Sequence, residues 1–297
     1  MKKKKIAFII NPVSGSINKD TIPSLIQQEL DLNKFKPNIS YTRYAGHATK
    51  LAIEYISRNY HCIVAVGGDG TVNEIALALR QTRTALGIIP IGSGNGLARH
   101  LGMSLNIRKA IQELNSAKVS KIDYCLLNNM PFFCTSGVGF DAYISQEFGK
   151  EKKRGPISYL EKVIKGFFSY QAQTYEIQYD GRKMQTEAFL ITAANASQWG
   201  NNAHIAPKAS IKDGLLDITI LKSFPIFFGP HLTFDVFTKN VNDNKYVRTI
   251  KTKEILITHP EKEIPFHLDG EPLGQAKEIH IKVIPEGIKI LCKHNFQ

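Results

Sequence analysis

The feature that most constrains the fold is a pattern in the first 125 residues, in which short apolar runs lead into turns and are followed by helical spacing. The apolar runs have the length of buried strands and lie at 6–10, 62–66 and 86–89. Helical spacing of apolar residues occurs at 22–30, 48–57, 72–79 and 105–114. Strands that alternate with helices favour a parallel, doubly wound α/β sheet, whose ligands bind beyond the carboxyl ends of the strands.

The pattern changes after about residue 125. Turn signals such as Asp180-Gly181 and Asp269-Gly270 now separate segments that have the length of strands. These segments are 174–179, 186–193, 215–221, 254–258, 265–268, 278–283 and 287–292. We therefore predict an α/β domain over residues 1–125, on which the last residues of the chain pack back. A mostly antiparallel β-sandwich domain is predicted over residues 126–297.

The net charge of +12, from 38 basic and 26 acidic residues, favours a polyanionic partner, such as a nucleotide phosphate, a nucleic acid or an anionic membrane. No apolar run approaches the roughly 20 residues that a membrane span needs. The run after the basic start Met1–Lys5 is too short for a signal peptide, so we expect a cytoplasmic protein. The four cysteines have no C-x-x-C spacing, which argues against a zinc site or a redox pair.

Three turns in the first half share one design, in which an apolar strand runs into glycine and small polar residues. They are Asn11-Pro12-Val13-Ser14-Gly15, Gly67-Gly68-Asp69-Gly70-Thr71 and Gly92-Ser93-Gly94-Asn95-Gly96. Glycine lets the backbone approach a phosphate closely, and the amides at the start of the next helix face the anion. Asp69 would repel a bare phosphate, which indicates a divalent cation between them, and Glu74 is placed to support this site. Three such turns in succession indicate a nucleotide, although neither G-x-G-x-x-G nor the P-loop pattern is present.

These motifs resemble those of the diacylglycerol kinase catalytic domain family, which includes bacterial lipid kinases and the sphingosine and ceramide kinases. NAD kinases and phosphofructokinases are its more distant relatives. The second turn with Asn73-Glu74 resembles the hallmark of the family, and Thr42 matches a threonine that contacts the nucleotide. The resemblance implies an ATP site formed by Asn11, Pro12, Ser14, Gly15, Thr42, Gly67, Gly68, Asp69, Gly70, Thr71, Asn73, Glu74, Gly92, Ser93 and Asn95.

The resemblance extends into the second half. The segment 210–215 resembles a loop that binds a structural Mg²⁺ in bacterial members, with the Asp213 carboxylate and the carbonyls of Ser210 and Leu215 as ligands. The segment 267–272 resembles the one that carries the general base, where Glu271 is the matching acid. Asp69 is the alternative base.

One residue departs from the family pattern. Gly96 stands where many bacterial members have an aspartate. If that aspartate helps to hold a metal, then Asp69, Asp123 or a water must replace it.

The resemblance implies an ATP- and Mg²⁺-dependent phosphotransferase that transfers the γ-phosphate to the hydroxyl of a membrane lipid such as diacylglycerol. Such an enzyme would act peripherally at the inner membrane surface, and two basic or aromatic segments, 148–170 and 224–230, are candidate contacts. The alternatives are a soluble-metabolite kinase of the NAD kinase type and a nucleotide-binding sensor without turnover. No RNA-binding motif is present, so we predict no nucleic acid partner. The sequence does not distinguish a monomer from a homodimer.

Overall fold

The computed structural model describes residues 3–15, 18–149, 166–167 and 169–293 of the 297-residue chain. Internal contacts divide the chain into two compact units: the first is Met1–Asp123 with Pro285–Gln297, and the second is Tyr124–Ile284. Two strands, β5 (Lys118–Leu127) and β16 (Glu278–Cys292), contribute residues to both units. No helix in the described part of the chain is long and apolar enough to span a membrane.

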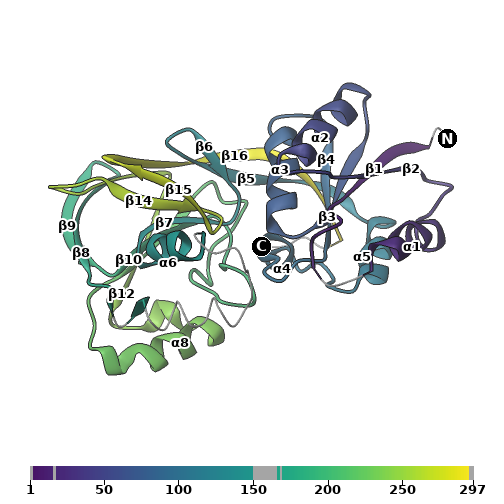
Figure 1. Ribbon diagram of the computed structural model, residues 1–297. Helices are drawn as coiled ribbons and strands as arrows, with labels where there is room; N and C mark the ends of the chain where they lie inside the picture. The colour runs from purple at the N-terminus through teal and green to yellow at the C-terminus, as the bar shows by residue number, and fades with distance from the viewer. Residues whose placement is uncertain (1–2, 16–17, 150–165, 168, 294–297) are drawn as a thin grey trace. The chain divides into compact units, whose positions relative to one another are not determined.

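The first unit is built on a parallel sheet in the order β2-β1-β3-β4 (Figure 1). The last part of β16 extends this sheet beyond β4, where Ile290 pairs with Leu86 in parallel. Every residue of β3 and β4 is buried, as expected for central strands that are covered on both faces. The strands are β1 (Lys4–Ile10), β2 (Phe35–Tyr41), β3 (Cys62–Gly67) and β4 (Ala85–Pro90).

Helices cover both faces of this sheet. On one face, Ile6, Phe8 and Ile10 share a buried core with apolar residues of α1 and α5. On the other face α2 packs against α3, which contacts β3 and β4. The helix predicted from residue 105 begins at Ile107, because the Asn106 side chain accepts a hydrogen bond from the Lys109 amide and caps it. The helices are α1 (Ile22–Glu29), α2 (His47–Ser57), α3 (Asp69–Leu79), α4 (Gly96–His100) and α5 (Ile107–Leu114), with a 3₁₀ turn, η1 (Lys19–Thr21), before α1.

The second unit is a β-sandwich. One sheet is antiparallel throughout, in the order β12-β11-β10-β7-β14-β15. The other has the order β16-β13-β8-β9 and also contains β5 and β6. Apolar residues of both sheets, such as Val138, Ile191, Ile177 and Ile257, form one buried cluster. The remaining strands are β6 (Met130–Phe132), β7 (Thr135–Gly139), β8 (Gln173–Tyr179), β9 (Arg182–Ala188), β10 (Leu190–Ala194), β11 (Leu216–Leu221), β12 (Val247–Thr252), β13 (Glu254–Thr258), β14 (Ile264–Leu268) and β15 (Glu271–Ala276).

Helices also belong to the second unit. Helix α6 (Phe140–Gly149) packs on β7, β14 and β15. The connection between β11 and β12 contains η2 (Ile226–Phe228), α8 (Gly229–Thr238) and η3 (Val241–Asp243). The parallel α/β unit and the mostly antiparallel sandwich confirm the predicted fold class.

Three sequence predictions differ from the observed elements. The strand predicted at 186–193 is two strands, because the chain leaves one sheet after β9 and enters the other at β10. The strands predicted at 278–283 and 287–292 are one, β16. Glu286 adopts a φ of 52° and its amide donates to Asp123 Oδ1 at 2.8 Å, so the strand bends there without ending. The helices α4, α6 and α8 were not predicted.

An ion pair between a buried acid and a partly exposed lysine links two strands of the six-stranded sheet. The Asp217 side chain is only 2% exposed, and its Oδ2 lies 3.3 Å from Lys251 Nζ on the neighbouring strand. Lys251 Nζ also donates to Asp213 Oδ2 at 2.9 Å. Burial raises the pKa of Asp217, and Lys251 opposes that rise.

We predict that Lys251→Met lowers the free energy of unfolding by about 1–3 kcal/mol at neutral pH, since it leaves a buried carboxylate uncompensated. This is less than for a fully buried pair because Lys251 is 41% exposed. The variant raises the folded-state pKa of Asp217 further, so the folded state binds the proton more tightly than the unfolded state. Its stability should therefore fall as pH rises above 3.8, and the deficit should be smaller at about pH 4.5 than at about pH 8.

Urea unfolding at both pH values measures this deficit. The matched control is Lys253→Met, which removes an exposed lysine two residues further along the chain. A deficit that is the same at both pH values, or equal in the control, would contradict the prediction.

Candidate active site

The three glycine turns meet at one edge of the first unit, because they follow β1, β3 and β4, which run parallel and side by side. The Asn11 side chain joins the first turn to the second, with Nδ2 donating to Thr71 Oγ1 at 3.0 Å. The second and third turns touch through glycine. A Cβ atom on Gly92 would lie 2.5 Å from Gly68 Cα, and one on Gly15 would lie 1.8 Å from the Ile91 carbonyl oxygen. No larger residue fits these two positions unless the backbone moves.

Asp69 locks the second turn to the third. Its Oδ2 accepts from the Asn95 amide at 2.8 Å, and its Oδ1 accepts from the Gly96 amide at 2.7 Å. Burial raises the pKa of Asp69, while these two amides work in the opposite direction. The amide of Gly96, the residue that departs from the family pattern, is thus a partner of Asp69. Both carboxylate oxygens are engaged within the protein.

Glu74 performs a similar task one helical turn further into α3. Its two carboxylate oxygens accept from the amides of Gly46 and Ala48 at 2.9 and 3.0 Å, at the start of α2. Thr42 lies just before this turn, and its amide donates to the carbonyl of Ile10, the last residue of β1. The segment with Thr42 is therefore held beside the first glycine turn.

The start of α3 provides the donors for an anion. Gly68 is its N-cap, and the amides of the first helical turn have no partner within the helix. Such amides, together with the positive end of the helix dipole, bind phosphate. One edge of the sheet thus carries the predicted nucleotide residues of all three glycine turns, together with Thr42. Glu271, Ser210, Asp213 and Leu215 belong to the second unit.

The turn that carries Glu271 is fixed by its neighbour Asp269. The Asp269 carboxylate accepts from three successive backbone amides, those of Phe133, Cys134 and Thr135, at 2.7–3.0 Å. Asp269 and Gly270 both adopt positive φ, 48° and 84°, and connect β14 to β15. This tight hairpin with three charge-assisted hydrogen bonds holds the backbone rigidly just before Glu271.

A buried imidazole holds the same hairpin from the other side. His267 Nδ1 accepts from the Gly270 amide at 3.2 Å, and His267 Nε2 lies 3.1 Å from Asp141 Oδ2. Asp141 Oδ2 also accepts from the Thr192 hydroxyl at 2.7 Å. No role for these three side chains was predicted from the sequence. The one signal was that His267 lies in the segment 267–272, which resembles the family.

Glu271 itself is exposed, and its carboxylate has no hydrogen-bond or ion-pair partner in the described part of the chain. The structure therefore presents a free carboxylate on a rigid support. A carboxylate of this kind is able to accept a proton from a substrate hydroxyl.

In the predicted magnesium loop, 210–215, the Asp213 carboxylate is already paired with the ammonium group of Lys251. Asp213 Oδ2 is paired with Lys251, and Asp213 Oδ1 accepts from the Leu215 amide at 3.1 Å. Among the described residues there is no group of three or more His, Cys, Asp or Glu side chains that could hold a metal. The Asp213 carboxylate thus already has partners within the protein, and the Mg²⁺ site at Ser210, Asp213 and Leu215 stays a prediction.

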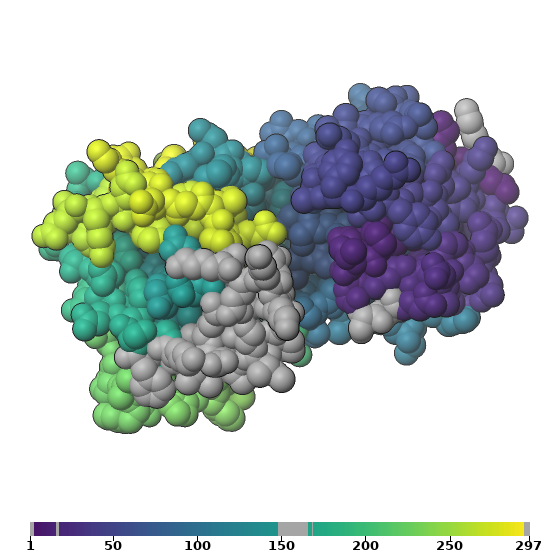
Figure 2. All heavy atoms as spheres, in the orientation of Figure 1, coloured from purple at the N-terminus to yellow at the C-terminus, as the bar shows by residue number. Residues whose placement is uncertain are grey.

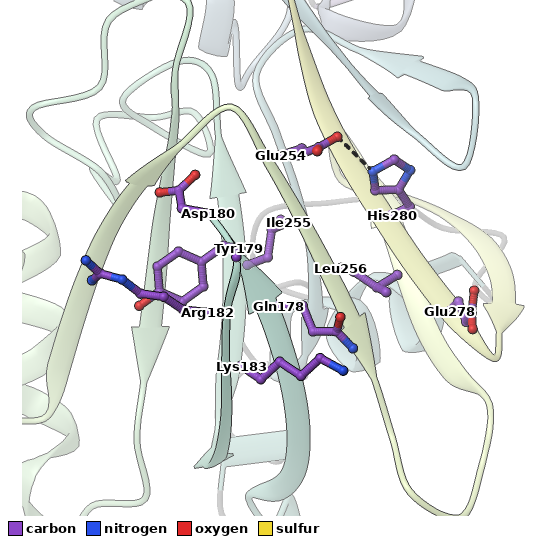
Figure 3. Close-up of a pocket in the computed structure, with 11 residues that line it drawn as sticks. Gln178, Tyr179, Asp180, Arg182, Lys183, Glu254, Ile255, Leu256, Glu278 and His280 are labelled. Carbon is purple, nitrogen blue, oxygen red and sulfur yellow. Dashed lines mark hydrogen bonds and ion pairs between the residues drawn. The ribbon is translucent and has the colours of Figure 1, made fainter.

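A separate hollow of about 490 Å³ lies on the outer face of the second unit (Figure 3). It is lined by residues of β8, β9, β13 and β16 with charges of both signs, and His280 Nε2 lies 3.3 Å from Glu254 Oε2 in it. It contains none of the predicted site residues.

Comparison with known proteins decides the family. The model of the diacylglycerol kinase catalytic domain matches residues 5–127, and that of the YegS C-terminal NAD kinase beta sandwich-like domain matches residues 135–292. A diacylglycerol kinase of Bacillus subtilis is 30% identical over 275 residues, which are 90% of each chain. The chain belongs to the diacylglycerol kinase family. It is accordingly a kinase with an alcohol group as acceptor.

Further relatives agree with this assignment. A Yersinia enterocolitica protein named "probable lipid kinase YegS-like" is 33% identical over 254 residues, 83% of this kinase and 81% of the relative. The crystal structure of a "putative diacylglycerol kinase" from Bacillus anthracis strain Sterne superposes with a TM-score of 0.83 at 26% identity, covering 100% of this chain and 99% of that chain. Yeast NADH kinase shares the fold, with a TM-score of 0.52 at 12% identity over 99% of this chain and 84% of that chain.

We predict that Gly92→Ala weakens ATP binding more than Gly68→Ala does. The methyl added by Gly92→Ala would lie 2.5 Å from Gly68 Cα and would force the second and third turns apart. The methyl added by Gly68→Ala would lie 3.3 Å from Gly92 Cα. We expect a loss of about tenfold or more for Gly92→Ala and a several-fold smaller loss for Gly68→Ala, because backbone clashes cost about 1–3 kcal/mol.

Calorimetric titration with ATP measures both variants. The two substitutions add the same group to opposite sides of one contact, so each is the control for the other. Equal ATP affinities for both variants and the wild type would contradict this account of the turns.

Proposed function

We propose that this kinase transfers the γ-phosphate of ATP to the hydroxyl of a membrane lipid such as diacylglycerol. The observation that carries the proposal is the pairing of two features in one chain: interlocked glycine turns suited to phosphates, and a free carboxylate, Glu271, on a rigid hairpin. A nucleotide-binding sensor needs only the first feature. The names of the relatives, a diacylglycerol kinase and lipid kinases, support a lipid as the acceptor.

In this proposal the first unit binds ATP. The amides at the start of α3 and the hydroxyls of Ser14, Thr71 and Ser93 hold the phosphates, and Asp69 and Glu74 position the surrounding turns. Mg²⁺ that arrives with ATP would neutralise phosphate charge, which phosphoryl transfer requires. The contacts of Asp213 give no support for an additional structural Mg²⁺ there, so we assign no step to that loop.

Glu271 is the proposed general base. It accepts the proton from the lipid hydroxyl as the hydroxyl oxygen attacks the γ-phosphorus and the bond to the bridging oxygen of ADP breaks. Asp69 is the weaker candidate, because both of its oxygens are engaged by amides. His267, Asp141 and Asp269 do not act on the substrate in this scheme; they position the hairpin.

We predict that Glu271→Gln lowers kcat by about 10²–10⁴-fold, the usual contribution of general-base catalysis, and leaves ATP affinity within about twofold. The amide keeps the size of the side chain but cannot take up the proton. The measurement is transfer of labelled γ-phosphate from ATP with Mg²⁺ to a panel of lipid alcohols in mixed micelles, with NAD as the soluble acceptor.

The matched control is Glu263→Gln, at an exposed glutamate just before β14 in the same unit. Label in a lipid that disappears only in Glu271→Gln supports both the acceptor and the base. Label in NAD instead would assign the chain to the soluble-metabolite kinases. ATP binding without transfer to any acceptor would favour the sensor.

A further inference from the structure

Helix α8 and the preceding η2 turn present aromatic side chains outward. Phe227, Phe234 and Phe237 are 79%, 61% and 55% exposed, and Ile226 is 50% exposed. Phe234 and Phe237 are one helical turn apart on one side of α8, and Phe227 lies in η2, directly before the helix. Figure 1 shows α8 at the outer margin of the second unit, and Figure 2 shows its atoms, in light green, at the molecular surface.

The inward side of the same helix packs Leu232, which is half-buried, against the apolar core of the unit. Its fully buried residues are Gly229 and Asp235. The Asp235 carboxylate accepts from Asn244 Nδ2 at 2.6 Å and lies 3.6 Å from His231 Nε2, and a Cβ atom on Gly229 would lie 2.5 Å from the Phe167 ring. A helix that faces water normally buries its phenylalanines and exposes its acids. Helix α8 exposes both of its phenylalanines and buries one acid, so its outward side is suited to an apolar surrounding.

The chain around η2 and α8 is basic. Between residues 222 and 248 the exposed cations are Lys222, Lys239, Lys245 and Arg248, whereas the only exposed acid is Asp243. Lys245 Nζ lies 5.0 Å from the centre of the Tyr246 ring and 5.6 Å from that of Phe228. Aromatic rings flanked by lysine and arginine complement an anionic bilayer, in which the rings enter the acyl boundary and the cations meet the headgroups.

We propose that η2 and α8 are the surface by which this kinase docks on an anionic lipid bilayer, with Phe227, Phe234 and Phe237 inserted into the interface. The proposal rests on the proposed lipid kinase function for its reason to reach a bilayer. The segment 224–230 was one of the two membrane contacts expected from the sequence, and its Ile226 and Phe227 are exposed. Of the other, 148–170, the basic stretch 150–165 lies outside the described residues.

Sedimentation with large unilamellar vesicles tests the docking. The vesicles are pure phosphatidylcholine, or the same lipid with about 30% phosphatidylglycerol as the anionic component. We expect wild-type protein to bind the anionic vesicles, and the triple variant Phe227→Ser/Phe234→Ser/Phe237→Ser to bind them at least about tenfold more weakly, since three rings no longer leave water. The control Ile53→Ser/Leu105→Ser/Val119→Ser removes three exposed apolar residues of the first unit and should bind like wild type.

Equal vesicle binding by the triple variant and wild type overturns the proposal. A second measurement tests the proposal even if the triple variant fails to fold. The chain has a single tryptophan, so Trp199→Phe/Phe227→Trp places one fluorophore at the end of the docking surface. Its emission should shift to the blue on anionic vesicles. Sedimentation of this protein with vesicles without an emission shift overturns the insertion of residue 227.

Two further outcomes separate the alternatives. If light scattering without vesicles shows a wild-type dimer that the triple variant converts to a monomer, with vesicle binding unchanged, the face belongs to a second copy and the proposal is wrong. Lipid phosphorylation is measured in parallel, on vesicle-embedded and on dissolved short-chain lipid alcohol. Vesicle binding that the triple variant loses, with no phosphorylation of any lipid by either protein, supports docking and refutes the proposed function. If lipid is phosphorylated and the triple variant binds vesicles like the wild type, the proposed function is supported and the docking proposal is wrong.

Discussion

The carboxylate of Asp69 is the interaction on which the first unit's site depends. It is half-buried, and burial raises its pKa, yet two amides of the third turn donate hydrogen bonds to its two oxygens. The close approach of Gly68 and Gly92 follows from this contact, because the two turns must touch for the amides to reach the acid. The acid thus organises donors around a phosphate site. This explains its place among those donors without requiring that it hold a metal.

The second unit uses the same device for a different end. Asp269 collects three amides and His267 a fourth, and together they fix the two residues that precede Glu271. In both units a half-buried acid accepts hydrogen bonds from backbone amides with both of its oxygens, and in the second unit the proposed base, Glu271, lies two residues further along the chain. Pre-organisation of this kind places reactive groups without reorganisation during the reaction. Helix α8 of the second unit exposes its phenylalanine rings and buries Asp235, which suits contact with lipid and not with water.

The sequence predicted the features that local pattern controls. Strand, glycine turn and helix follow one another within a few residues, so the three turns and the α/β class could be recognised, and Asp269-Gly270 could be identified as a hairpin turn. Long-range partners could not be predicted. Asn95 lies 26 residues from Asp69 and Phe133 lies 136 from Asp269, and nothing local marks either pair. Helix α8 was missed because prolines and glycine around Phe227 and Phe228 are typical of a turn, and the switch of sheets at Phe189 leaves a continuous apolar run.

The most direct test of the central claim is amide hydrogen exchange of wild type and Asp69→Asn, with and without ATP. The asparagine keeps one acceptor oxygen and turns a donor toward the second amide. We expect ATP to protect segments 11–15, 67–72 and 92–96 in the wild type. The variant should lose protection at 94–97 and bind ATP about tenfold more weakly, as expected when a buried hydrogen bond to a charge is lost, while the β-sandwich exchanges as before. ATP that protects none of the three segments, or a variant that retains wild-type protection and affinity, would contradict the account.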